Sequence, residues 1–145
     1  MGFGELAQQT ALYPQEALAP VKTSQQSLRI GLPKEISLQE NRIALTPEAI
    51  AILVRNGHQV VVEKGAGEGA QLSDNEYSEA GAQVVYSPQE VFASDLILKI
   101  EPIVEQEFSY LKNGQTIISA LNLPTRERSY FEHLNDKHIT ALSYE

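Results

Sequence analysis

Six short apolar segments, separated by segments with helical pattern, constrain the fold of this chain more than any other sequence feature. They predict strands over 28–32, 60–63, 83–86, 95–100, 116–120 and 138–144. Strands that are apolar on both sides are typical of parallel sheets buried between helices. Right-handed crossovers then place the helices on the two faces. The sequence therefore predicts an α/β domain with an open, mostly parallel twisted sheet.

Helix boundaries between these strands are marked by residue type. Thr46, Ser73 and Ser87 are good N-cap residues, because a side-chain oxygen there accepts a free backbone N–H. Gly57 and Gly81 suit the left-handed position that follows a helix. The predicted helices run from Pro47 to just before Gly57, and over 74–80, 88–93, 105–111 and about 125–135.

Residues 1–27 differ in composition from the remainder, with many Gln, Ala and Ser residues. We predict an N-terminal extension over 1–27 and a single domain over 28–145. A short helix over 4–12 is compatible with the pattern, and Pro14 and Pro20 prevent a longer one. The extension is expected to be a surface arm, and its apolar residues leave docking on the domain or on a second subunit open.

Composition excludes several classes of function. The formal charge of −8 offers no basic face, so we expect no nucleic-acid partner. The chain has no cysteine, and its 3 histidines lack metal-ligand spacing, so we expect no metal. We also expect no membrane segment and a cytoplasmic location, because neither a long apolar run nor a signal peptide is visible.

Three polar residues lie at or beyond the carboxyl ends of predicted strands, where open α/β sheets bind ligands. Arg42 lies on the loop after the first strand, and its guanidinium suits a substrate carboxylate. The alternative is a surface arginine paired with Glu40 or Glu35. Lys99 ends the fourth strand and either enters a ligand crevice or extends from a sheet edge. Asn122 follows the fifth strand, where it either donates to a substrate carbonyl or forms a turn.

A glycine motif over 65–70, GAGEGA, fits the dinucleotide fingerprint G-x-G-x-x-A. That fingerprint requires the loop to run directly into a helix that holds the pyrophosphate. Here Gln71 and Leu72 intervene before Ser73, and Glu68 adds a negative charge. We therefore predict a structural glycine loop, with a phosphate cradle or a substrate-facing loop as the alternatives. The carboxylates of the chain show no spacing that singles out acid–base chemistry: Glu35, Glu40, Glu63 and Glu101.

Two longer stretches carry a family resemblance: IGLPKEISLQENRIALTP over 30–47 and LVRNGHQVVVEKGAGEGAQLSDNEYSEAGAQVV over 53–85. Together they resemble the N-terminal domain of alanine dehydrogenases and of the α subunit of proton-translocating nicotinamide nucleotide transhydrogenase. The resemblance covers about 28–145. It implies a Rossmann- or flavodoxin-like substrate domain that is incomplete without C-terminal helices. It also implies a separate NAD-binding domain that is absent from this chain. Because a sheet without its C-terminal helices leaves an apolar face open, we also expect a homo-oligomer.

Residue by residue, the resemblance is partial. Arg42 matches the family arginine that holds the substrate carboxylate. The family stretch V-K-V-K-E-P reads LKIEP over 98–102, so Lys99 matches only the first lysine. The family histidine in Y-L-H-L is replaced by Asn122 in ALNL over 120–123. An asparagine cannot act as a general acid or base near pH 7.

The resemblance implies the substrate-binding part of an NAD-dependent oxidoreductase that converts L-alanine to pyruvate and ammonia. Its ligand would be a small amino or keto acid, with Arg42 binding substrate and Lys99 and Asn122 in the catalytic positions. This chain alone is expected to be inactive. The alternatives are a soluble segment of a transhydrogenase α subunit and a non-catalytic regulatory or assembly domain of the same fold.

Overall fold

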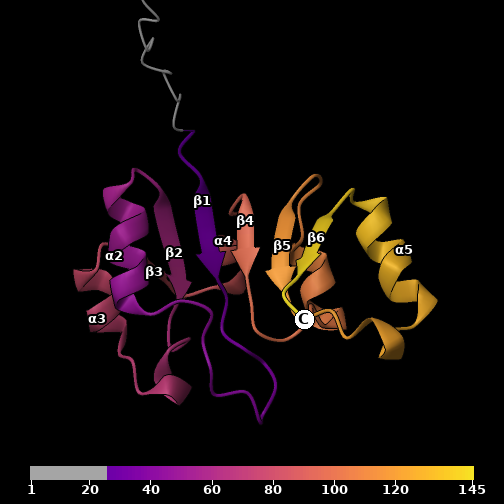
Figure 1. The fold of residues 1–145 in the computed structure, drawn as a ribbon, viewed down its shortest axis with the longest axis horizontal. Helices are drawn as coiled ribbons and strands as arrows, with labels where there is room; N and C mark the ends of the chain where they lie inside the picture. Colours follow the sequence, from indigo (N-terminus) through magenta and orange to yellow (C-terminus); the bar gives the residue numbers. More distant parts are fainter. Residues whose placement is uncertain (1–25) are drawn as a thin grey trace, which may run out of the picture.

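The computed structural model describes residues 26–145, which form one six-stranded sheet with the order β3-β2-β1-β4-β5-β6 (Figure 1). The predicted extension therefore lies outside the described residues, apart from residues 26 and 27. The six strands are β1 (Arg29–Leu32), β2 (Gln59–Glu63), β3 (Gln83–Val85), β4 (Leu96–Leu98), β5 (Thr116–Ser119) and β6 (Thr140–Ser143). Each predicted strand is confirmed, with ends that differ by a few residues.

Every strand pair of the sheet is parallel, so the prediction of a mostly parallel sheet is confirmed. The chain moves outward from β1 to β3, then returns to pair β4 with the free side of β1. This is the strand order of dinucleotide-binding folds, in which ligands bind where the order reverses. Here the reversal lies between β1 and β4, and their carboxyl ends point to the same edge of the sheet (Figure 1).

The helices begin where the capping residues predict. The α-helices are α2 (Pro47–Arg55), α3 (Asp74–Glu79), α4 (Pro88–Phe92) and α5 (Arg128–Asp136). Thr46, Ser73 and Ser87 each accept an N–H bond from the third residue of the helix that follows. The short 3₁₀ helices are η1 (Glu68–Ala70), η2 (Glu105–Tyr110) and η3 (Leu123–Thr125).

Two helix predictions need correction. The segment predicted as a helix over 105–111 is the 3₁₀ helix η2, followed by extended backbone at Leu111. The helix predicted over about 125–135 is divided, because extended backbone at Arg126 and Glu127 separates η3 from α5. Helical periodicity does not distinguish a run of 3₁₀ turns from an α-helix when the segment is short.

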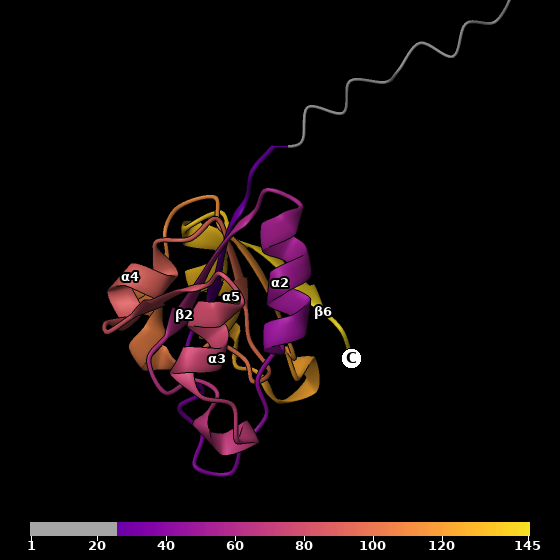
Figure 2. The ribbon, with the colours of Figure 1, turned by 90° about the vertical axis from the view of Figure 1, so that its left-hand side faces the viewer.

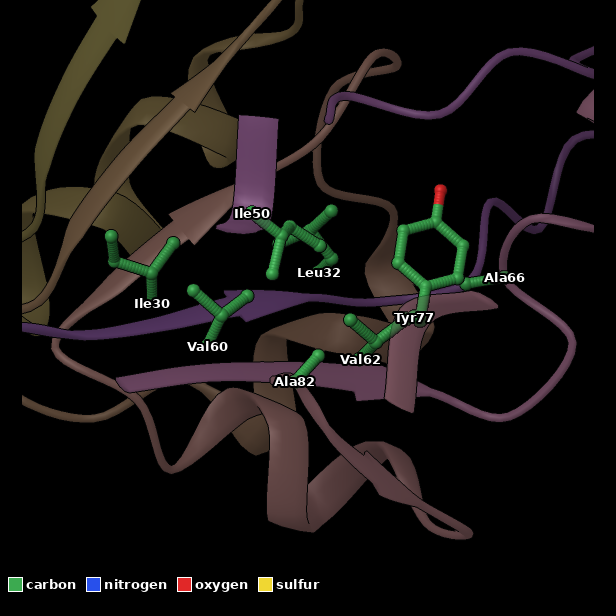
Figure 3. Close-up of a cluster of buried hydrophobic side chains, with 8 residues drawn as sticks. All are labelled: Ile30, Leu32, Ile50, Val60, Val62, Ala66, Tyr77 and Ala82. Atoms are coloured by element: carbon green, nitrogen blue, oxygen red, sulfur yellow. The ribbon is translucent and has the colours of Figure 1, made fainter. Parts of the chain in front are cut away.

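Helices cover both faces of the sheet (Figure 2). Side chains of β1 and β2 on one face pack with α2 and α3 in a cluster that contains Ile50 and Tyr77 (Figure 3). On the opposite face, Val61 packs with Val91 of α4. Alternate residues of a strand face opposite sides, and this explains why nearly every strand residue is apolar.

One part of the α2 face is less covered than the rest. Leu98, Ile118 and Leu142 are aligned across β4, β5 and β6, and Leu142 is 49% exposed. Within residues 26–145, α2 and α3 instead contact β2 and β3. The half of the sheet that β4, β5 and β6 form therefore carries a row of apolar side chains on the α2 face. Among the described residues, no helix is long and apolar enough to cross a membrane.

Candidate functional site

A cavity of about 670 Å³ lies at the carboxyl ends of β1 and β4, where the strand order reverses. Its walls come from the loop after β1 and the segment after β4, with Arg126 contributed from beyond β5. The titratable residues that line it are Glu35, Lys99, Glu101, Glu105 and Arg126. The site therefore combines several charges with a position at which this fold type binds ligands.

Lys99 lies at the wall of this cavity and is only 1% exposed. Its Nζ atom donates to both carboxylate oxygens of Glu107, at 2.6 and 2.8 Å. A second carboxylate, that of Glu35, lies 3.7 Å away. The alternative in which Lys99 extends from a sheet edge is wrong, because β4 is flanked by β1 and β5.

Glu35 connects the two loops that form the cavity. Its carboxylate accepts the backbone N–H of Ile100 at 2.6 Å and that of Glu101 at 3.4 Å. Burial raises the pKa of Glu35, and the nearby Lys99 ammonium only partly offsets that increase. Burial likewise raises the pKa of Glu63, whose carboxylate accepts the Lys34 N–H at 2.8 Å.

The sequence pattern did not identify this buried group of charges. Glu107 lies eight positions after Lys99 in sequence, on η2, and nothing local marks it as the partner of a buried lysine. Its carboxylate also accepts the Val104 N–H at 2.9 Å, in the manner of a helix cap. A glutamate as the third residue of η2 was therefore the only available signal, and it indicated capping rather than pairing.

Arg42 lies on the loop after β1, and 73% of its side chain is exposed. It pairs with Glu40 through two bonds, from Nε at 2.9 Å and from a terminal nitrogen at 2.7 Å. Hydrogen bonds from Arg42 lower the pKa of the Glu40 carboxyl to about 2. Arg42 and Glu35 both line a smaller cavity of about 280 Å³. Arg42 therefore shares a cavity with Glu35, while its side-chain donors bind the carboxylate of Glu40.

The Glu40–Arg42 pair predicts acid sensitivity. Because the pKa of folded Glu40, about 2, lies below its ordinary 4.5, the unfolded chain binds the proton more readily. The stability that Glu40 contributes is therefore complete above about pH 4.5 and is lost as the pH falls toward 2. Urea unfolding of the wild type and of Glu40→Gln between pH 6 and pH 3 measures this. We expect their difference to shrink at low pH; a constant difference would contradict the pairing.

The glycine loop over 65–70 packs against the loop that carries Arg42. A Cβ atom built on Gly69 would lie 2.8 Å from Asn41 Cα and 2.9 Å from the Asn41 carbonyl oxygen. One built on Gly67 would lie 2.6 Å from the Leu72 carbonyl oxygen. The space beside these glycines is filled by the protein backbone, so this loop does not fit a dinucleotide pyrophosphate. The observation agrees with the predicted structural loop.

Gly69→Ala is expected to destabilise the protein by about 1–3 kcal/mol, the usual effect of forcing extra atoms into a packed site. Gly69 does not have positive φ, so the effect is steric and acts on the Arg42 loop. Gly114→Ala measures backbone strain alone, because Gly114 has φ 72° but no atom within 4 Å of a built Cβ. Urea unfolding measures both variants. A Gly69→Ala protein as stable as the wild type would mean that the contact with Asn41 is unimportant.

Asn122 begins the turn after β5, with a left-handed backbone at φ 50°. Its N–H donates to the Glu145 carboxylate at 3.0 Å, and its carbonyl oxygen accepts the Thr125 hydroxyl at 2.9 Å. The backbone of Asn122 therefore forms a turn, which is one of its two predicted roles. Nearby, the Tyr144 hydroxyl donates to the Ile100 carbonyl oxygen at 2.5 Å, which attaches the segment after β6 to the end of β4.

Comparison with known proteins agrees with this architecture. The family model described as "Alanine dehydrogenase/PNT, N-terminal domain" matches residues 31–145. The chain is 38% identical over 116 residues to alanine dehydrogenase of Bacillus subtilis, and 41% identical over 117 residues to that of Methanococcus maripaludis. Each alignment covers 80% of this chain but 30% and 31% of the relative, so the chain spans about a third of their length.

Solved structures give the same result. An L-alanine dehydrogenase superposes with a TM-score of 0.78 and 36% identity, covering 81% of this chain and 32% of that one. A transhydrogenase from Sinorhizobium meliloti superposes with a TM-score of 0.73 and 30% identity, covering 79% and 34%. The parallel sheet, its strand order and these matches agree, and the chain belongs to the alanine dehydrogenase/PNT N-terminal domain family.

Proposed function

We propose that this chain is the substrate-binding domain of an alanine-dehydrogenase-like, NAD-dependent oxidoreductase that interconverts L-alanine with pyruvate and ammonia. The observation that carries the proposal is Arg42, a guanidinium on the loop after β1, beside the cavity at the strand reversal. The identity of 38–41% to alanine dehydrogenases supports the reaction class. The domain would extend over 28–145, with the cofactor held by a part of the enzyme outside this chain.

Arg42 would release the Glu40 carboxylate and bind the substrate carboxylate in its place. Its bonds to Glu40 already have the two-point geometry in which a guanidinium recognises a carboxylate. A substrate carboxylate that takes the place of Glu40 would find the same donors in the same plane. The exposure of Arg42 makes this exchange possible without opening the core.

Lys99 and Asn122 would act beside the reacting carbon. The Lys99 ammonium at the cavity wall would stabilise the carbonyl oxygen of the keto acid through its positive charge. Asn122 would donate from its side-chain amide to the same group, since an amide supplies hydrogen bonds without titrating. A nicotinamide bound by the remainder of the enzyme would supply the hydride chemistry.

The proposal is tested with the full-length enzyme, assayed for NADH formation from L-alanine and for NADH consumption with pyruvate and ammonium. Turnover in both directions supports it. Failure with alanine, pyruvate and a panel of other amino and keto acids would contradict it. That result would favour the non-catalytic regulatory or assembly role.

A transhydrogenase segment is the second candidate, because Asn122 stands where the dehydrogenases have histidine and the second lysine of their motif is missing. The likeness to the Sinorhizobium transhydrogenase also supports it. The same enzyme preparation would then transfer hydride between NADH and an NADP⁺ analogue without any amino acid. Alanine-dependent turnover without such transfer favours the dehydrogenase.

A further inference from the structure

Glu35 lines two of the cavities at the carboxyl ends of the strands. The cavity beside Lys99 and the cavity beside Arg42 share three lining residues: Glu35, Ile36 and Ser37. Of these three, only Glu35 carries a titratable side chain. A ligand whose carboxylate is bound by Arg42 and whose reacting carbon approaches Lys99 would therefore pass beside the Glu35 carboxylate.

The surroundings of Glu35 hold its carboxylate in place. The N–H groups of Ile100 and Glu101 fix its orientation, and its side chain is 6% exposed. Lys99 Nζ lies 3.7 Å from it but donates at 2.6 and 2.8 Å to Glu107. The ammonium is thus primarily the partner of Glu107, and Glu35 is the second, less fully compensated carboxylate.

Titratable groups face Glu35 from each element that packs against it. They are Lys34 on its own loop, Glu40, Arg42 and Glu68 across the smaller cavity, Glu63 at the end of β2, Lys99 and Glu101 after β4, Glu105, Glu107 and Tyr110 on η2, Arg126 before α5 and Tyr144 after β6. Burial outweighs the nearby positive charges, so the pKa of Glu35 is raised. A carboxyl of this kind exchanges its proton nearer neutral pH than an exposed one.

We propose that Glu35 is the acid–base residue of this site. In amino-acid oxidation, one N–H bond of the substrate ammonium breaks and an O–H bond forms on the Glu35 carboxylate. The electron pair of the broken bond stays on nitrogen, which gives the neutral amine from which oxidation proceeds. Glu35 then releases the proton to solvent; in reductive amination it returns a proton to the amine. The inference rests on the proposed function.

The first test uses Glu35→Gln in the full-length enzyme, with Glu35→Asp and Glu79→Gln as companions. Glutamine keeps the size but cannot exchange a proton, so kcat for L-alanine is expected to fall about 100-fold or more, with KM within about threefold. Aspartate is expected to retain part of the activity and the pH dependence. Glu79 is exposed on α3 and lines neither of the two cavities, so Glu79→Gln controls for loss of charge and is expected to stay close to wild type.

The second test reads the pH dependence of kcat/KM in Glu107→Gln. Without Glu107, the Lys99 ammonium faces only the Glu35 carboxylate and favours its ionised form. The rise of kcat/KM with pH, its ascending limb, is therefore expected to occur about one pH unit lower. The position of this limb does not depend on the fraction of enzyme that is folded. The test therefore stands even if Glu35→Gln does not fold.

Two results would overturn the inference while leaving the proposed function intact. One is a folded Glu35→Gln enzyme with wild-type kcat and the wild-type pH limb. The other is an unmoved limb in Glu107→Gln, which would assign Glu35 a structural role that joins the two loops. A wild-type enzyme without any amino-acid turnover would instead overturn the proposed function, and this inference with it.

Discussion

Replacing Lys99 by methionine is expected to lower the free energy of unfolding by about 3–5 kcal/mol, the range for removing one partner of a buried ion pair. Lys99 and Glu107 are 1% and 2% exposed at their side chains, so water cannot replace the lost ammonium. Methionine fills a similar volume, so the change isolates charge from packing. The two carboxylates that remain, Glu107 and Glu35, would also repel each other. Urea unfolding near pH 7 measures the change.

Two controls separate this effect from an unspecific one. Lys99→Met combined with Glu107→Leu removes both charges, and it is expected to recover much of the loss, because apolar pairs often replace buried ion pairs without penalty. Arg128→Met breaks the exposed pair with Glu132, where Nε and the carboxylate are 2.8 Å apart, and is expected to change stability by less than about 1 kcal/mol. A Lys99→Met protein as stable as Arg128→Met would show that the buried pair contributes little.

Arg42→Ala in the full-length enzyme is expected to raise KM for pyruvate about 10-fold or more, because it removes the charged hydrogen bonds to the substrate carboxylate. The expected loss lies in binding, because the substrate carboxylate is not the reacting group. Arg42→Lys is expected to recover only part of it, since an ammonium lacks the planar pair of donors. Steady-state kinetics with pyruvate as the varied substrate gives the result.

The control for Arg42 is Arg55→Ala, which removes a positive charge from the last turn of α2, at the other end of the helix that follows the Arg42 loop. It is expected to leave KM unchanged. Glu40→Gln provides a further comparison, because it frees Arg42 from its present partner and is expected to lower KM. An unchanged KM in Arg42→Ala would remove Arg42 from substrate binding and leave the Glu40 pair as its role.

The elements of the fold could be read from the sequence because each has a local cause. Apolar runs predicted the strands, and Thr46, Ser73 and Ser87 predicted where three helices begin. The helix prediction failed at 105–111 and near 125, where short segments adopt 3₁₀ turns. Local pattern does not decide between these geometries, because the packing of η2 against the sheet contributes more than its intrinsic preference.

The site was predicted less completely. Arg42 and Lys99 stood out, since Arg42 is a charged residue on the loop after the first strand and Lys99 one at the end of the fourth, and both line cavities at the strand reversal. Glu35 and Glu107 did not stand out, because their significance depends on Lys99, to which they come from other elements. A buried ion pair between segments distant in sequence has no periodicity that could reveal it.

The sequence by itself therefore determined the class of fold, the family and the loop that carries Arg42, because apolar pattern, capping residues and a specific motif are local properties. Only the tertiary structure decided that β4 pairs with β1, and that pairing brings the ends of two distant segments together. It also decided that Lys99 is enclosed by Glu107 and Glu35. Charge pairing of this kind arises from proximity in space, and proximity follows from the order of the strands.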